Sequence, residues 1–390
     1  MKQLRTLVRK LLREAFLNEE GPRRISFPFD LPSNVVVLSD IFRKNGFELY
    51  VVGGAVRDMI LGKEPKDYDL VSDATPDEVE SILGDNYKTI PTGKAFGIIT
   101  VVMPDGEEYE IAKYREDLGS GRRPEGGVKF STIDQDVKRR DLTINALYYD
   151  IAKQEIIDYV GGVEDIQNRN VKAVGDASER FEEDRLRILR AVRFAARFDS
   201  QLDPEIQKTL TVNNSLKGVS KERIRDEFVK GIQSAKSVVK FLRTLEEYDL
   251  LLQILFGLEY DTGQFVDEHD HIVLLACLLH ELDTEIVSGT LLNLRYTLDE
   301  VSKISFLILF KYFRPELIYK LKKLQKSSGI SDEQVLKFAK WNSLDMKLVN
   351  AFLGFRFSVT GDELMSQGFK GRELGQEMER RETENFMKSL

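Results

Sequence analysis

Two aspartates spaced one residue apart, Asp67 and Asp69, follow a glycine pair at Gly53 and Gly54. If residues 66–71 form a strand, the alternation of side chains places both carboxylates on one face. Adjacent carboxylates repel each other unless a cation lies between them, and Mg²⁺ is the usual cation in such sites. A Gly-Gly turn between an apolar strand and a short helix offers backbone N–H groups to phosphate. Either feature alone would be an ordinary turn or a solvated loop, but together they predict nucleotidyl transfer.

The predicted metal site needs a third acidic group near the aspartate pair. Glu110 lies on a predicted strand and is the best candidate, and Glu108 would share its face. Two Mg²⁺ ions held by such acids would lower the pKa of an attacking hydroxyl and neutralise charge on a triphosphate. An exposed strand carboxylate without a catalytic role is the competing interpretation of Glu110.

A second polar segment runs from Arg139 to Asn145 and includes Arg140 and Asp141. Arginine side chains bind phosphate oxygens in a bidentate geometry, and an aspartate can accept a hydrogen bond from a ribose hydroxyl. A salt-bridged helix start would have the same composition. The nucleotide-binding interpretation is favoured because the same region carries the Gly-Gly turn.

Residues 181–198 have the apolar periodicity of one amphipathic helix. On that helix Asp184, Arg187, Arg190 and, more loosely, Arg193 recur at steps of three and form one polar stripe. An Asp acceptor beside Arg donors matches the Watson–Crick edge of cytosine or adenine and opposes the carbonyl of uracil or guanine. Arg190 and Arg193 would continue towards the triphosphate. A salt-bridged surface helix is the alternative.

The length and composition set limits on these interpretations. A chain of 390 residues predicts two or more domains. The net charge of −8 means that any nucleic-acid contact would use a local basic surface. Cys277 is the only cysteine, which excludes an intramolecular disulfide and suits a reducing, cytoplasmic location. The longest apolar run, residues 272–279, is too short to span a bilayer.

The coarse pattern predicts an α+β fold, with a small mixed-sheet head followed by an all-α remainder. Glycine-rich, charged residues 116–127 predict a mobile loop within the head. The first residues form a basic amphipathic segment, which we interpret as a surface helix in preference to a transit peptide. Strands are predicted at residues 47–52, 68–71, 97–103, 108–114 and 146–150. Helices are predicted at residues 35–45, 55–61, 75–83, 221–234, 237–255, 272–279, 298–313, 316–327 and 331–341.

In order and spacing, these motifs resemble those of the class II tRNA nucleotidyltransferases, the CCA-adding enzymes of the polymerase-β-like superfamily. The resemblance is dense from about residue 47 to 230 and thinner beyond it. Matching segments are Gly-Gly-Ala-Val-Arg-Asp at 53–58, Asp-Tyr-Asp at 67–69, Arg-Arg-Asp-Leu-Thr-Ile-Asn-Ala at 139–146, Asp-Tyr-Val-Gly-Gly-Val-Glu-Asp at 158–165, Glu-Asp-Arg-Leu-Arg at 183–187, Ser-Lys-Glu-Arg-Ile-Arg-Asp-Glu at 220–227, Thr-Gly-Asp-Glu-Leu-Met at 360–365 and Gly-Arg-Glu-Leu-Gly at 371–375.

The resemblance implies template-independent addition of C, C and A to the 3′ end of tRNA from CTP and ATP. It implies two-metal transfer with release of pyrophosphate, Mg²⁺ held by Asp67 and Asp69, and catalysis by these residues with Glu110. Asp184 and Arg187 would act as an amino-acid template. The implied nucleotide-binding residues are Gly54, Arg57, Arg140, Asp141, Asn145, Asp184, Arg187, Arg190 and Arg193.

The same resemblance implies a division into head, neck, body and tail. The tRNA acceptor arm is the implied partner, and neither a membrane nor an obligate protein partner is expected. The predicted ranges are 1–32 for the N-terminal extension, which the family pattern does not cover, 33–150 for the catalytic head, 151–218 for a neck that selects nucleotides, 219–315 for a helical body and 316–390 for a helical tail that binds tRNA.

Several alternatives remain at this point. Bacterial poly(A) polymerases usually carry a Gly-Arg-Arg-Phe-like segment where this chain has Thr-Gly-Lys-Ala-Phe-Gly at 92–97, and CC-only relatives look shortened where residues 116–127 are full length. An A-adding enzyme or a non-catalytic RNA-binding protein is also open. A His-Asp phosphohydrolase, suggested by residues 269–271 and 280–281, is disfavoured because the chain has only three histidines. Arg185 departs from the family, in which many relatives have proline.

Overall fold

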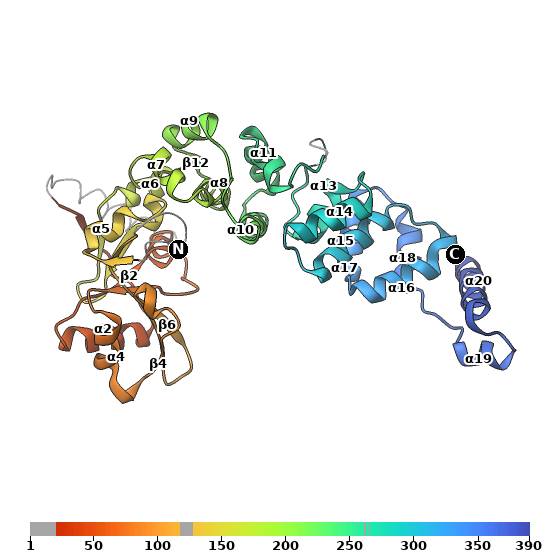
Figure 1. The fold of residues 1–390 in the computed structure, drawn as a ribbon, viewed down its shortest axis with the longest axis horizontal. Coiled ribbons are helices and arrows are strands. Elements are labelled where there is room, and N and C mark those ends of the chain that lie inside the picture. Colours follow the sequence, from red (N-terminus) through yellow and green to blue (C-terminus); the bar gives the residue numbers. More distant parts are fainter. Residues whose placement is uncertain (1–20, 118–127, 261–262, 264) are drawn as a thin grey trace. The chain divides into compact units, whose positions relative to one another are not determined.

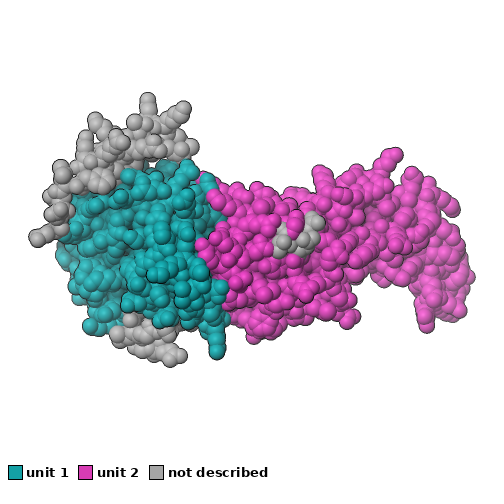
Figure 2. Space-filling model, turned by 90° about the horizontal axis from the view of Figure 1, so that it is seen from above, with its two compact units in different colours: residues 1–219 teal, residues 220–390 magenta. Residues whose placement is uncertain are grey.

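The computed structural model of the protein describes residues 21–117, 128–260, 263 and 265–390. They divide into two compact units, residues 1–219 and 220–390, which Figure 2 shows in teal and magenta. Residues 1–20 of the predicted extension and residues 118–127 of the predicted loop lie outside the described residues.

An eight-stranded mixed sheet forms the centre of the first unit (Figure 1). Its neighbouring strands are antiparallel except for one parallel pair, β3 and β6. In spatial order the strands are β1 (Arg23–Ser26), β10 (Glu155–Asp158), β9 (Leu147–Asp150), β2 (Leu49–Val52), β3 (Leu70–Ser72), β6 (Glu108–Lys113), β5 (Ile98–Val102) and β4 (Lys88–Ile90).

The central strands are buried on both faces, which explains why β2 reads as a continuous apolar run. Alternate residues of β2 enter two different clusters, Leu49 and Val51 on one face and Tyr50 and Val52 on the other. The first face is covered by helices α2 (Ser33–Lys44), α3 (Gly54–Ile60) and α4 (Pro76–Leu83). The second is covered by α5 (Ile133–Lys138), through Val137. The site described below lies on this α5 face.

The rest of the first unit is mostly helical. It contains a short hairpin, a two-stranded sheet and four further helices. These elements are β7 (Arg115–Asp117) with β8 (Val128–Phe130), β11 (Asn170–Val171) with β12 (Gln201–Leu202), and helices α6 (Gly162–Asn168), α7 (Ala177–Glu183), α8 (Leu186–Phe198) and α9 (Pro204–Val212).

The second unit is helical wherever the structure describes regular structure. The apolar run at 272–279 is the buried core of α13, so it packs inside this unit. Its helices are α10 (Lys221–Ser234), α11 (Val238–Glu247), α12 (Leu250–Ile254), α13 (His271–Leu279), α14 (Thr284–Asn293), α15 (Leu298–Phe310), α16 (Ile318–Ser328), α17 (Asp332–Trp341), α18 (Met346–Gly354), α19 (Gly361–Ser366) and α20 (Gly371–Ser389). Across the described ranges, none of the helices has both the length and the hydropathy needed to cross a membrane.

The structure confirms the predicted fold class, a mixed-sheet head followed by helices, and all five predicted strands of the head. The sheet also includes β1 and β10, so the predicted head of residues 33–150 leaves out two of its strands. The predicted helix at 237–255 is two helices, because Asp249 between them has a left-handed backbone with φ of 52°.

The prediction of a single helix over residues 181–198 is wrong. Helix α7 ends at Glu183 and α8 begins at Leu186. Between them the backbone of Asp184 is extended, with φ of −149° and ψ of 100°. Its side chain accepts a hydrogen bond from the Leu186 N–H at 3.2 Å. A short Asp side chain that binds a nearby N–H stabilises a helix start in preference to a helix interior.

Candidate active site

The two aspartates of the DYD segment lie immediately before a strand and not within it. Strand β3 begins at Leu70, so the predicted strand over residues 66–71 is wrong for its first four positions. The sheet nevertheless reaches Asp69, because the Val52 N–H donates to the Asp69 carbonyl at 2.9 Å. Asp69 is therefore held by the backbone of the central strand β2.

Asp69, which directly precedes β3, and Glu110 of the parallel partner strand β6 lie on the same face of the sheet. In this pair Leu70 is opposite Ile111, so the residue before each is also adjacent. Along β6, Tyr109 and Ile111 are buried while Glu108 and Glu110 are exposed, which confirms that the two glutamates share a face. By the same alternation Asp69 shares the face of Val71, which packs on the α5 side.

The electrostatics of Asp69 show that three carboxylates gather here. Loss of water around its carboxylate raises the pKa of Asp69, and the charges of Asp67 and Glu110 raise it further. Only Arg140 acts in the opposite direction. Mutual repulsion of this kind is relieved by a bound cation.

These carboxylates have the donor chemistry that suits a hard divalent cation, since all three supply oxygen ligands. Within the described residues, no three His, Cys, Asp or Glu side chains are close enough to form a complete metal site. Mg²⁺ is commonly held by one or two carboxylates together with water and substrate phosphates. The Asp67–Asp69 pair fits that partial form of coordination.

The Gly-Gly turn lies against the polar segment that follows α5. Gly53 has a positive φ of 73°, a conformation that favours glycine, and its N–H donates to the Leu147 carbonyl at 2.9 Å. A Cβ at Gly53 would lie 3.5 Å from the Asn145 carbonyl oxygen and 3.6 Å from Arg140 Nη1. Helix α3 then begins at Gly54. The turn therefore brings its backbone next to a guanidinium group.

A chain of hydrogen bonds joins three of the predicted motifs. Arg57, which is buried, donates through Nη1 to Asn145 Oδ1. The Asn145 side-chain amide donates to Asp141 Oδ1 at 3.3 Å. Asp141 Oδ2 accepts from Arg190 Nε and Nη2, each at 2.6 Å. The GGAVRD segment, the RRDLTINA segment and helix α8 are thus one connected structure.

The buried charges in this chain of hydrogen bonds are balanced locally. Burial would raise the pKa of Asp141, but Arg190 and the hydrogen bonds to the carboxylate lower it below its usual value. Burial lowers the pKa of Arg57, and Asp58, bound at 3.0–3.1 Å, partly offsets that effect. Arg57 therefore has structural partners already, in addition to any role with phosphate.

Stacked rings complete the environment of the arginines. Phe194 and Phe198 of α8 stack with centroids 5.9 Å apart. The Arg57 guanidinium lies 5.2 Å and 4.9 Å from their respective centroids. Arg193 is buried, 4.1 Å from the Phe194 ring, and Arg190 lies 5.6 Å from it. Cation–π contacts of this kind let several guanidinium groups converge in a small volume.

Asp184 and Arg187 are the predicted base-reading residues. Because the helix is broken at Asp184, they do not lie on one continuous helical stripe. Arg187 donates to Glu183 Oε2 at 2.7 Å and to the Arg139 carbonyl at 2.8 Å. The Asp184 carboxylate accepts a hydrogen bond from the N–H of Leu186, the first residue of α8. The structure thus places Arg187 against the RRD segment, although the geometry is not the predicted step-of-three stripe from Asp184.

Some residues that build the site were missed by the sequence interpretation. Asp136 is fully buried and binds Arg139, Arg140 and the Tyr148 hydroxyl. Its spacing of three and four residues from the two arginines was a usable signal, because such pairs are neighbours on a helix. The contact between Tyr148 and Asp136 could not be predicted in this way, because it depends on how β9 pairs within the sheet.

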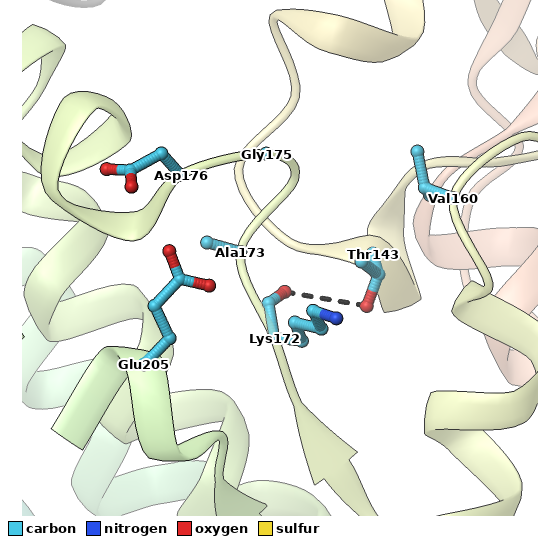
Figure 3. Close-up of a pocket in the computed structure, with 7 residues that line it drawn as sticks. All are labelled: Thr143, Val160, Lys172, Ala173, Gly175, Asp176 and Glu205. Atoms are coloured by element: carbon cyan, nitrogen blue, oxygen red, sulfur yellow. Dashed lines mark hydrogen bonds between the residues drawn. The ribbon is translucent and has the colours of Figure 1, made fainter. Parts of the chain in front are cut away.

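Two surface pockets lie away from the three carboxylates. One, of about 420 Å³, lies beside the segment that follows Asp141, and its lining side chains come from separate loops and helices, as Figure 3 shows. At this pocket the Thr143 hydroxyl donates to the Lys172 carbonyl at 3.5 Å. The lining residues are Thr143, Val160, Lys172, Ala173, Gly175, Asp176 and Glu205.

The second pocket, of about 570 Å³, lies in the second unit and includes the His-Asp-His segment. Here His269 contacts the Ile232 carbonyl at 2.9 Å, and His271 contacts Glu300 at 2.9 Å. Asp270 caps α13 and accepts from Gln334 at 2.9 Å. These side chains serve packing and capping, and the described residues offer no set of metal ligands here. The phosphohydrolase alternative therefore has no structural support.

Comparison with known proteins shows which families the chain is similar to. Residues 49–172 match the family model described as "Poly A polymerase head domain", and residues 201–261 match "Probable RNA and SrmB- binding site of polymerase A". A CCA-adding enzyme of Lactobacillus helveticus is 42% identical over 205 residues, 51% of this chain and 50% of that protein. One from Staphylococcus aureus strain Newman is 40% identical over 213 residues, 53% and 52% of the two chains. The chain therefore spans about half the length of the curated relatives it matches.

Solved structures extend the likeness in fold to nearly the whole chain. The Bacillus stearothermophilus CCA-adding enzyme in complex with CTP has a TM-score of 0.70 and 24% identity, covering 91% of this chain and 92% of that chain. The Thermotoga maritima CCA-adding enzyme complexed with tRNA has a TM-score of 0.65 and 19% identity, covering 97% and 94%. At these identities the structures establish the fold alone. In sequence, the chain is similar to CCA-adding enzymes over about half of its length.

Proposed function

We propose that this protein adds C, C and A to the 3′ end of tRNA, using CTP and ATP without a nucleic-acid template. One observation carries the proposal: the hydrogen-bonded chain from Arg57 through Asn145 and Asp141 to Arg190. It joins the GGAVRD and RRDLTINA segments to helix α8, and Arg140, which precedes Asp141 in the chain, acts electrostatically on Asp69. The curated relatives are named CCA-adding enzymes, and two related structures hold CTP or ATP.

In this proposal Asp67 and Asp69 hold Mg²⁺, and Glu110 completes the acidic group. When bound, the metal would lower the pKa of the attacking hydroxyl and neutralise charge on the triphosphate. The tRNA 3′ oxygen loses its proton and forms a bond to the α-phosphorus of CTP or ATP. The bond from that phosphorus to the bridging oxygen breaks, and pyrophosphate leaves.

The arginines hold the nucleotide in this proposal. Gly54, Arg57 and Arg140 would bind the triphosphate, and the proximity of the Gly-Gly turn to the Arg140 guanidinium supports this assignment. Asp141 and Asn145 would receive the ribose, and Arg190 and Arg193 would extend the phosphate site. Asp184 and Arg187 would read the base edge, after the nucleotide replaces or shares the present contacts of Arg187 with Glu183 and the Arg139 carbonyl.

An incorporation assay tests the proposal directly. The full-length protein is given α-labelled CTP or ATP and tRNAs that lack CCA, lack CA or lack only the final A. We expect C to enter the first two substrates and A to enter the third, with growth that stops after A. Extension by many A residues would identify a poly(A) polymerase, whereas C alone or A alone would identify a partial enzyme.

A tRNA-binding test separates catalysis from RNA binding. We expect the acceptor arm to be bound by local basic residues of the regions predicted as neck, body and tail, despite the net charge of −8. Each phosphate contact should then lower log K by about 0.9 per decade of salt, so two or more contacts should lower affinity by roughly tenfold or more from 50 mM to 200 mM salt. A tRNA affinity that is independent of salt would contradict the assignment. Binding without incorporation would instead indicate a non-catalytic RNA-binding protein.

A further inference from the structure

We propose that Asp136 is a positioning residue that fixes Arg139 and Arg140 for binding of a nucleoside triphosphate. This inference rests on the proposed function, because it concerns the same nucleotide site. Asp136 lies on α5, with no surface exposed to solvent, and is not expected to touch the substrate. It would act through the arginines that follow it.

The Asp136 carboxylate accepts hydrogen bonds from four surrounding groups. Oδ1 accepts from the Arg115 backbone N–H at 3.2 Å and from Arg139 Nε at 2.8 Å. Oδ2 accepts from Arg140 Nη2 at 2.9 Å and from the Tyr148 hydroxyl at 2.6 Å. A carboxylate accepts on both oxygens, whereas an amide presents one acceptor and one donor group. No orientation of an asparagine side chain can therefore satisfy all four donors.

The surrounding groups also stabilise the negative charge of Asp136. Burial alone would raise its pKa, but Arg140, Arg139 and the Tyr148 hydroxyl outweigh that effect and lower the pKa to about 2. The side chain is therefore a carboxylate at any pH at which the protein would act. Burial would lower the pKa of Arg140, but Tyr148 and Asp136 outweigh that effect and raise the pKa above its usual value.

Asp136 also fixes the direction in which Arg140 points. The guanidinium is held between Asp136 and the Tyr148 ring, whose centroid is 5.1 Å away. Its remaining Nη1 lies 3.6 Å from the Cβ position of Gly53. One edge of Arg140 is thus used by Asp136 and Tyr148, while the other faces the turn where the triphosphate would bind.

The backbone at the end of α5 also binds two arginines of the predicted neck, Arg180 and Arg187. The Lys138 carbonyl accepts from Arg180 at 2.7 Å, and the Arg139 carbonyl accepts from Arg187 at 2.8 Å. The side chain of Arg139 is held by Asp136 at the same time. Displacement of Arg139 would therefore disturb both the phosphate-binding arginines and Arg187.

The test compares Asp136→Asn with Asp134→Asn in the full-length protein. Both residues lie on α5 and undergo the same chemical change, but the described contacts of Asp134 are with Thr132 and Gln135. We expect Asp136→Asn to raise the KM for CTP and for ATP by about tenfold or more, with a smaller change in kcat, because ground-state binding of the triphosphate is lost. The Asp134→Asn protein should have the KM of the wild type. Loss of folded protein alone would lower apparent kcat and leave KM unchanged, and that result would overturn the proposal.

A second variant covers the case in which Asp136→Asn does not fold. Tyr148→Phe keeps the ring and removes only the hydroxyl that binds Asp136 and Arg140. It should raise KM for both nucleotides in the same direction by a smaller factor, and an unchanged KM would count against the proposal.

A double-mutant cycle with Arg140→Lys asks whether Asp136 acts through Arg140. In the Arg140→Lys background, loss of the Asp136 carboxylate should raise KM by a clearly smaller factor than in the wild type. Equal factors in both backgrounds would show that the two residues act independently and would refute the inference. If the wild type incorporates neither CTP nor ATP into tRNA, the proposed function itself fails, so the two failures are distinguishable.

Discussion

Replacement of Asp67 or Asp69 by alanine should abolish nucleotide incorporation while the protein remains folded. The expected loss is about a thousandfold or more in the initial rate, because metal-assisted charge stabilisation contributes several kcal/mol to the barrier. The rate is measured with α-labelled CTP on tRNA that lacks CCA. Glu110→Gln should also reduce the rate, and Glu108→Gln, on the same face but two residues further along β6 from Asp69, should reduce it less.

The thermal stability of Asp69→Ala is not expected to fall with its activity. An acid whose pKa is raised in the folded state destabilises the fold when it is ionised. The stability linked to the pKa of Asp69 is therefore fully present below its unfolded value and is lost as pH rises through the folded pKa. At neutral pH, Asp69→Ala removes this repulsion, so its melting temperature without metal should equal or exceed that of the wild type.

A metal-binding measurement tests the role of Asp67 and Asp69 without an activity assay. Mg²⁺ with a triphosphate should raise the melting temperature of the wild type and have a much smaller effect on Asp67→Ala or Asp69→Ala, since a ligand stabilises only the state that binds it. Asp85→Ala is the matched control, because Asp85 is an exposed aspartate of the same unit. Substantial incorporation by either of the two site variants would refute the assignment.

The sequence predicts the site well where its features are local. The strands of the head have apolar patterns that are visible within five or six residues, and the structure confirms them. The turn at Gly53 was also predictable, since its backbone adopts the positive φ that glycine allows. The exposed face shared by Glu108 and Glu110 follows from strand alternation alone.

The sequence does not show the parts of the site that depend on contacts between distant segments. The bond from Arg57 to Asn145 joins residues 88 positions apart, and the bond from Arg190 to Asp141 joins residues 49 apart. No periodicity encodes such contacts, because they arise only when the sheet is assembled. The break at Asp184 was missed for another reason. The apolar pattern continues through this residue, but its backbone is extended and its side chain accepts from the Leu186 N–H.

The break gives the base-reading hypothesis a sharper test than a continuous helix would. If Asp184 and Arg187 read the nucleotide, removal of the Asp184 carboxylate should alter selectivity. Each hydrogen bond to a base edge is worth roughly 1–3 kcal/mol of discrimination, or about 5- to 150-fold. Asp184→Ala should therefore incorporate UTP or GTP at a higher rate relative to CTP and ATP, as measured by competition between labelled nucleotides.

Loss of the cap at α8 must be separated from loss of the base contact. Asp184→Ala removes the acceptor for the Leu186 N–H, which alone costs about 0.5–2 kcal/mol of stability. Asp184→Ser keeps a cap through its hydroxyl but lacks the carboxylate. If the carboxylate reads the base, both variants should lose selectivity, and only the alanine variant should be clearly less stable. Glu182→Ala, at an exposed carboxylate two residues away, should retain both selectivity and stability.

Arg190 provides the contrast that decides the interpretation. Its guanidinium binds Asp141 and is proposed to extend the triphosphate site, where contacts carry no information about the base. Arg190→Ala should slow all four nucleotides by similar factors and leave their ratios close to those of the wild type. If Asp184→Ala and Asp184→Ser produce this same uniform slowdown, then Asp184 does not read the base. The segment between α7 and α8 would then be a structural connection that holds Arg187 against the Arg139 carbonyl.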